Sequence, residues 1–240
     1  MGILVDNAKV VSINDAHQEG VDTSLEKNPT SSVAKGLRVH HIFSRNRKGR
    51  RRDDGNPLIH ALKRQKGFTI TAHWKSQLLN KGRTIVGSMQ DELSDFDYCL
   101  AIPSSSTFCD ECAVLVSETL GVPMLGEALF RKKLIGEMLA DVAASPPRMK
   151  PSMRVKYTSQ LNTWQSADPE VICHAKSVDT SIRAHFQFLK LIDGVPDIAY
   201  RRFIVVDDIM SSGSSLLSAR EILVNQLGAE AVGVTFLGPL

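Results

Sequence analysis

The sequence predicts an α/β fold in which helices cover both faces of a parallel sheet. Three short apolar segments carry this prediction, namely 97–103 (DYCLAIP), 201–209 (RRFIVVDDI) and 231–240 (AVGVTFLGPL). Their centres are apolar throughout rather than alternating, as in strands that are buried on both faces, and helical patterns lie between them. With 240 residues, 42% of them hydrophobic, the chain can bury an ample core without disulfide or metal support.

The pattern changes near residue 95, which we take as a boundary. Residues 1–94 are polar and weakly patterned, and we expect an N-terminal arm and a helical hood or interface region there. Residues 95–240 carry the alternation of strands and helices and are expected to form the core, with an insertion at about 134–200. Asn56 and Pro57 are typical of an N-cap and a first helical position. The other elements that we expect are helices over 57–66, 72–80, 104–120, 134–144, 181–193 and 212–227, and strands over 9–13, 122–130 and 153–157.

The positive charge of the chain is concentrated in one segment. Residues 45–52 (RNRKGRRR) hold six basic side chains, and removing them changes the net charge from +3 to −3. A general attraction to nucleic acid is therefore not expected, and the segment is either a solvated loop or a local contact for RNA, DNA or another polyanion. The side chains concerned are Arg45, Arg47, Lys48, Arg50, Arg51 and Arg52.

Two cysteines have the spacing of a redox or zinc motif. Cys109 and Cys112 form a CxxC pair, but no second pair follows, and both share an apolar helix face with Val116 and Leu120. This periodicity favours packing in the core, where cysteine behaves as a small hydrophobe. The sequence has no apolar run of about 18 residues and no secretory signal pattern, so we expect a cytoplasmic protein without membrane association.

The segment 203–215 (FIVVDDIMSSGSS) holds the main chemical motif. Four apolar residues bring Asp207 and Asp208 to the C-terminal end of a strand, the edge at which open α/β sheets bind ligands. Small residues around Gly213 then lead into a helix, and such a turn can present backbone N–H groups to a phosphate. The two acids beside it can hold sugar hydroxyls or a magnesium ion. This combination predicts a site for a ribose 5-phosphate.

Other interpretations of this segment are weaker. A strand that ends in two acids also resembles a Walker B motif, but the required GxxxxGK[ST] string is absent, as is the GxGxxG of dinucleotide-binding folds. The structural alternative is that Asp207 and Asp208 cap a helix and the serines fill an ordinary turn. Two adjacent acids followed by five small residues at one sheet edge favour the ligand site.

At these residues the sequence resembles the type I phosphoribosyltransferases (PRTases), whose signature is an apolar strand, two acids and a Thr- or Ser-rich loop that opens a helix. The resemblance implies a PRTase-like parallel sheet. It also implies a Mg²⁺-dependent enzyme that transfers the 5-phosphoribosyl group of phosphoribosyl pyrophosphate (PRPP) to a nitrogenous acceptor with release of pyrophosphate. Asp207 and Asp208 would then be the catalytic and metal-binding pair at the ribose hydroxyls. The 5-phosphate would be held by Ser211, Ser212, Gly213, Ser214 and Ser215.

Two upstream segments are consistent with this resemblance. Residues 102–107 occupy the place of the pyrophosphate loop, which assigns pyrophosphate binding to Ser104, Ser105 and Ser106 or, alternatively, makes them an N-cap. Arg131 and Lys132 resemble the Arg-Lys pair by which some members grip pyrophosphate, since guanidinium groups suit a diphosphate. The alternative for this pair is a solvated helix start.

The resemblance also has gaps. About 70 residues separate Lys133 from the acid pair, which is longer than usual for the family, and no general base is found because Ser211 stands where purine-specific relatives have an aspartate. The acceptor is not readable from the sequence. The alternative function is a non-catalytic PRTase-fold regulator or effector subunit that binds PRPP or a nucleotide and associates with nucleic acid through residues 45–52. In either case we expect a homodimer.

Overall fold

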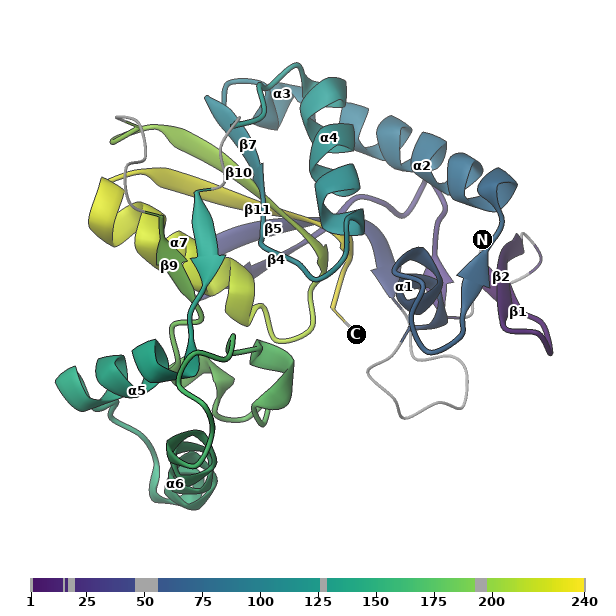
Figure 1. Ribbon diagram of the computed structural model, residues 1–240. Helices are drawn as coiled ribbons and strands as arrows, with labels where there is room; N and C mark the ends of the chain where they lie inside the picture. Colours follow the sequence, from purple (N-terminus) through teal and green to yellow (C-terminus); the bar gives the residue numbers. More distant parts are fainter. Residues whose placement is uncertain are drawn as a thin grey trace.

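The computed structural model describes residues 2–14, 16, 20–45, 56–125, 129–192 and 198–239, and its centre is a six-stranded sheet (Figure 1). Four neighbouring strands run parallel, in the order β5, β11, β10 and β7. The short strands β3 and β4 pair antiparallel with β5. The predicted α/β class with a parallel sheet is confirmed. The six strands are β3 (Val21–Asp22), β4 (Thr30–Ala34), β5 (Leu37–Arg45), β7 (Tyr98–Ala101), β10 (Arg202–Ile209) and β11 (Glu230–Leu237).

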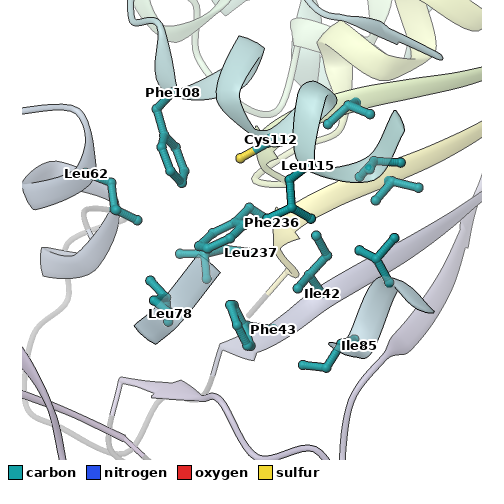
Figure 2. Close-up of a cluster of buried hydrophobic side chains, with 14 of the residues drawn as sticks. Ile42, Phe43, Leu62, Leu78, Ile85, Phe108, Cys112, Leu115, Phe236 and Leu237 are labelled. Carbon is teal, nitrogen blue, oxygen red and sulfur yellow. The ribbon is translucent and has the colours of Figure 1, made fainter. Parts of the chain in front are cut away.

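Helices cover both faces of this sheet. On strand β10, Ile204 and Val206 belong to a cluster shared with helices α2 and α4, whereas Phe203 and Val205 belong to a cluster shared with α7. Figure 2 shows the first cluster, in which the ring of Phe236 on β11 lies among apolar side chains of several elements. None of the helices in the described ranges is long and apolar enough to cross a membrane. The three covering helices are α2 (Ala72–Gly87), α4 (Phe108–Leu120) and α7 (Ser214–Leu227).

The CxxC cysteines belong to this core. Cys109 and Cys112 are both fully buried on α4, and Cys112 is visible in Figure 2 between α4 and the sheet. Burial raises the pKa of both thiols well above its ordinary value, and the nearby carboxylates raise it further. Each is a free thiol. The structure confirms the prediction that they pack as small hydrophobes.

The expected helical hood over 1–94 is not confirmed, because strands are mixed with helices there. Strand β5 lies inside the main sheet beside β11, so the first 94 residues and the remaining chain share one sheet. His41 of this strand is 1% exposed, and its ring lies 2.7 Å from Thr235 Oγ1 and 2.9 Å from Ser32 Oγ. Paired in this way, a polar ring is tolerated in a core. The other elements are β1 (Gly2–Val5), β2 (Val10–Asn14), β6 (Thr69–Ile70), α1 (Pro57–Leu62) and α3 (Gln90–Leu93).

The insertion at about 134–200 has a hydrophobic cluster of its own. In it, Phe186 stacks on Tyr157 with ring centroids 5.0 Å apart and meets Trp164 edge-on at 4.8 Å. Helices α5 (Ile135–Ala144) and α6 (Pro151–Gln165) carry much of this cluster and project away from the main sheet (Figure 1).

Two predictions within the insertion are wrong. The expected strand over 153–157 is part of α6, whose start is favoured by Pro151 at the first helical position. The expected helix over 181–193 is a short 3-10 turn, η2 (Arg183–His185), followed by strand β9 (Leu189–Leu191), which pairs with β8 (Phe130–Lys132). Tertiary pairing with β8 therefore outweighs the local helical pattern. A second 3-10 turn, η1 (Ala175–Ser177), lies before η2.

Candidate functional site

A cleft of about 220 Å³ lies where strands β7 and β10 end. Both strands run parallel, so the polar segments that follow them meet at one sheet edge, as the ligand sites of open α/β sheets do. Most of the residues predicted for a site are brought together here. The predicted residues that line the cleft are Ser104, Ser105, Lys132, Asp207, Asp208, Ser211, Ser212, Gly213, Ser214 and Ser215.

The turn that opens α7 is built for an anion. Gly213 has φ 70°, a left-handed conformation that glycine adopts without strain, and a Cβ at this position would lie 3.1 Å from Cε of Met210. Ser212 Oγ and Ser214 Oγ lie 2.7 Å apart across the turn. No side-chain cap occupies the start of this 14-residue helix, and its first turn contains no acidic residue. Backbone N–H groups and the positive end of the helix dipole are therefore available to an anion in the cleft.

The two acids on β10 have different surroundings, because adjacent residues of a strand point to opposite faces. Asp207 is half-buried and lines the cleft, and its Oδ1 accepts the backbone N–H of Asp208 at 2.8 Å. Asp208 is 2% exposed, and its Oδ2 lies 2.5 Å from Nζ of Lys63. Lys63 follows the last residue of α1 and is an ion-pair partner that the sequence did not reveal.

Burial and neighbouring charges shift the pKa values of three groups at the cleft. Burial, and then the adjacent Asp208, raise the pKa of Asp207. Burial lowers the pKa of Lys132, and the nearby Lys176 lowers it further. Burial, followed by the two lysines, also lowers the pKa of His174. A bound cation would stabilise the ionised form of Asp207, and a bound anion would stabilise the charged form of Lys132.

Cationic side chains reach the cleft from three separate parts of the chain. They outnumber the two carboxylates, so the cleft favours a ligand with several negative charges. Of these cations, only Lys132 was predicted from the sequence. The others come from the end of α1 and from the two 3-10 turns of the insertion, and no sequence motif relates those segments to β10. The four cations are Lys63, Lys132, Lys176 and Arg183.

Two predicted residues do not line the cleft. The guanidinium of Arg131 donates to both carboxylate oxygens of Glu137, at 2.7 and 2.6 Å, and these hydrogen bonds lower the pKa of Glu137 well below its ordinary value. Arg131 therefore ties β8 to α5. Ser106 Oγ accepts the backbone N–H of Phe108, the first residue of α4, at 3.2 Å, although the N-cap position itself is Thr107.

Arg45 is the one member of the basic run within the described residues, and it is not part of a solvated surface. Its side chain is buried, its Nη2 donates to the carbonyl oxygen of Met210 at 2.6 Å, and its Nε donates to that of Gly238. The prediction that Arg45 contacts nucleic acid is corrected accordingly, because these bonds tie its guanidinium to the backbone of Met210 and Gly238. The other predicted contacts, Arg47, Lys48, Arg50, Arg51 and Arg52, lie outside the described residues.

The residues present fit a magnesium ion. Carboxylate oxygens of Asp207 and Asp208 lie within 4.8 Å of one another and of Cys109 Sγ. The Cys109 thiol donates to the carbonyl oxygen of Val206 at 3.3 Å, and burial keeps it protonated, so it does not suit a cation that prefers oxygen. One or two carboxylates, completed by oxygens of a phosphorylated substrate, form the usual donor set of magnesium.

No protein-family model matches the chain, and no curated protein matches its sequence. Solved structures that it resembles include adenine phosphoribosyltransferases. That of Saccharomyces cerevisiae, complexed with an imino-altritol bisphosphate and adenine, is 18% identical with a TM-score of 0.37, and the match covers 71% of this chain and 70% of that one. Those of Leishmania tarentolae and Leishmania donovani are 12% and 11% identical, both with a TM-score of 0.38, and the matches cover 99% of this chain and 94% and 86% of theirs. At such identities and TM-scores the similarity says nothing about activity.

Proposed function

We propose that this protein is a Mg²⁺-dependent phosphoribosyltransferase, which transfers the 5-phosphoribosyl group of PRPP to a nitrogenous acceptor and releases pyrophosphate. One observation carries the proposal. The anion-binding turn 211–215, the carboxylate of Asp207 and the cations Lys132 and Lys176 line the same cleft. PRPP carries a phosphate at one end, ribose hydroxyls in the middle and a diphosphate at the other end, and the cleft offers complementary groups for each part.

Each part of the substrate has a place in this proposal. The turn 211–215 binds the 5-phosphate through backbone N–H groups and serine hydroxyls. Asp207 accepts hydrogen bonds from the ribose hydroxyls. The diphosphate, which carries most of the charge, lies toward Ser104, Lys132 and Lys176. A magnesium ion, when bound beside the acid pair with Asp207 as its carboxylate ligand, supplies charge neutralisation of the diphosphate.

The proposed reaction is a displacement at ribose C1. The bond from C1 to the pyrophosphate oxygen breaks, a bond from the acceptor nitrogen to C1 forms, and the configuration at C1 is inverted. Positive charge develops on the ribose and negative charge on the leaving group. The carboxylate of Asp207 stabilises the first, and the ammonium groups of Lys132 and Lys176 stabilise the second, so positioning and fixed charges supply most of the catalysis.

A second candidate function is a non-catalytic protein that binds PRPP or a nucleotide. It is favoured by the lining of the cleft, where the described residues include no aromatic side chain besides His174 on which a base could stack. The pairing of Asp208 with Lys63 also leaves one carboxylate to face a ligand. Association with nucleic acid through residues 46–52, and assembly as a homodimer, stay predictions.

The two candidates are separated by pyrophosphate release. The full chain is incubated with PRPP, Mg²⁺ and a mixture of nitrogenous bases, and pyrophosphate is measured over time, with Asp207→Asn as the inactive control. The proposed enzyme releases pyrophosphate only when both Mg²⁺ and an acceptor are present. Tight PRPP binding in calorimetry without release would favour the second candidate, and the lack of both binding and release would contradict both.

A further inference from the structure

A buried ion pair joins the N-terminal region to the acid pair of β10. The side chains of Lys63 and Asp208 are 16% and 3% exposed, and Nζ of the lysine lies 2.5 Å from Oδ2 of the aspartate. Two buried charges are costly unless each neutralises the other. The carboxylate of Asp208 thus already has a cation of the chain beside it.

The local backbone explains how Lys63 reaches this position. It is the C-cap of α1, with its backbone N–H bonded to the carbonyl oxygen of Ile59 at 3.0 Å. The chain then turns sharply, with Arg64 and Lys66 both at φ 53°, a left-handed conformation that is costly for residues other than glycine. This turn also places Gln65 on the wall of the cleft. The strained turn therefore directs the side chains of Lys63 and Gln65 toward the acid pair.

Asp207 also lines the cleft, but its surroundings differ from those of Asp208. It is half-buried rather than enclosed, and its Oδ1 accepts the backbone N–H of Asp208. An ammonium group and a divalent cation compete for the same carboxylate oxygens. Of the two acids, Asp207 is the one whose carboxylate faces the cleft without a lysine at ion-pair distance among the described residues.

We propose that Lys63 is the counter-cation of Asp208 and that its ammonium group prevents the Asp208 carboxylate from binding a metal ion. Asp207 is then the carboxylate that binds a divalent cation and the ribose hydroxyls. The role of Lys63 rests on the proposed function, because Lys63 determines which of the two acids binds the ion in the proposed magnesium site. Lys63 is thus a positioning residue that sets how many carboxylates a metal ion meets. An ion pair that serves folding alone would not control metal affinity.

The test measures the binding of Mn²⁺ alone to the full chain by calorimetry. In Lys63→Met the freed Asp208 becomes a second carboxylate ligand, so Mn²⁺ binds about tenfold more tightly than to the wild type, since affinity rises with the number of charged ligands. In Lys63→Arg a cation is restored and the affinity returns to that of the wild type. In the double variant Lys63→Met/Asp208→Asn the gain is lost.

A second comparison of Mn²⁺ affinities tests the role of Lys63 even if Lys63→Met does not fold. Asp208→Asn and the neutral double variant are compared with Asp207→Asn. The role of Lys63 requires that Asp207→Asn abolishes Mn²⁺ binding while the other two stay within about twofold of the wild type. A loss in Asp208→Asn as large as in Asp207→Asn, or a folded Lys63→Met with unchanged affinity, overturns it. Either result leaves the proposed function standing, because pyrophosphate release by the wild type is measured separately.

Discussion

Asp207 and Asp208 are neighbours in sequence, but only Asp208 lies in an ion pair with Lys63. The alternation of β10 places Phe203 and Val205 against α7 and Ile204 and Val206 against α2 and α4, and it continues into the acids. Both acids line the cleft, but Asp207 is half-buried there, whereas Asp208 is almost fully buried beside Lys63. This difference makes the two acids separable by mutation.

We predict that Asp207→Asn weakens PRPP binding in the presence of Mg²⁺ by at least about tenfold, because charge-assisted hydrogen bonds are lost. The melting temperature does not fall, since the substitution removes a charge that the adjacent Asp208 repels. Calorimetry and thermal unfolding check both outcomes. The matched control is Asp110→Asn, an exposed acid of α4 outside the cleft lining, and equal affinities of the two variants would contradict the site.

Asp208→Asn, in contrast, should destabilise the protein by about 3 kcal/mol, because it leaves the ammonium of Lys63 buried without its partner. The double variant Lys63→Met/Asp208→Asn removes both charges and should recover most of this loss. Urea unfolding of the wild type, both single variants and the double variant gives the coupling free energy. A cost below about 1 kcal/mol for Asp208→Asn would show that the pair is solvated in solution.

The acid pair and its turn were predictable from sequence because they are local. An apolar strand, two acids, small residues around Gly213 and a helix follow one another along the chain, and the structure brings them together at one cleft. The alternation along β10 also separates the surroundings of Asp207 and Asp208, although the same role was predicted for both. Lys63 was not predictable, since no pattern links the end of α1 to an aspartate 145 residues later in the chain.

The parts of the fold that were missed share a physical reason. Strand β5 contains His40 and His41, whose burial depends on hydrogen bonds and charges contributed by distant residues such as Thr235 and Glu92. The 3-10 turns that carry Lys176 and Arg183 are held by long-range packing within the insertion rather than by local periodicity. Local propensity therefore predicted strand β10 and the turn 211–215, whereas tertiary contacts placed the cations of the insertion at the cleft.

Gly213→Ala should weaken PRPP binding by at least about tenfold, because the left-handed backbone disfavours alanine and the new Cβ meets Met210 at the turn to which we assign the 5-phosphate. The matched control is Gly121→Ala at the end of α4, where φ is 69° and no atom lies within 4 Å of the added Cβ. Both variants should lose about 1 kcal/mol of stability. Parallel losses of PRPP affinity in the two variants would contradict the assignment of the turn.

The buried His41 should make the protein sensitive to mild acid. Burial, and then His40 and Arg45, lower its pKa from 6.5 to about 4, so the ring is neutral in the folded state and gains a proton more readily when unfolded. Stability is therefore lost as the pH falls from about 6.5 to about 4, by about 3 kcal/mol, and no further loss arises from this group at lower pH. Urea unfolding at several pH values measures this loss of the free energy of unfolding.

The control for this acid sensitivity is a second histidine. His41→Gln is less stable than the wild type at pH 7, since the contacts to Thr235 and Ser32 change, but its stability should fall less between pH 6.5 and 4. His73→Gln, at an exposed position of α2, should retain the full decline of the wild type. If the stability of His41→Gln falls as steeply with pH as that of the wild type, groups other than His41 cause the acid sensitivity.

Lys176 tests which end of the cleft receives the diphosphate. Lys176→Ala should weaken the binding of PRPP by about fivefold at low salt, a size typical of an exposed charge, and the effect should shrink as salt is added. The binding of ribose 5-phosphate, which lacks the diphosphate, should be unchanged. The matched control is Lys156→Ala, a lysine of the same insertion that pairs with Asp179 at 2.9 Å and does not line the cleft. Equal losses for PRPP and ribose 5-phosphate would place Lys176 at the sugar phosphate instead, and no loss for either would remove the insertion from the binding site.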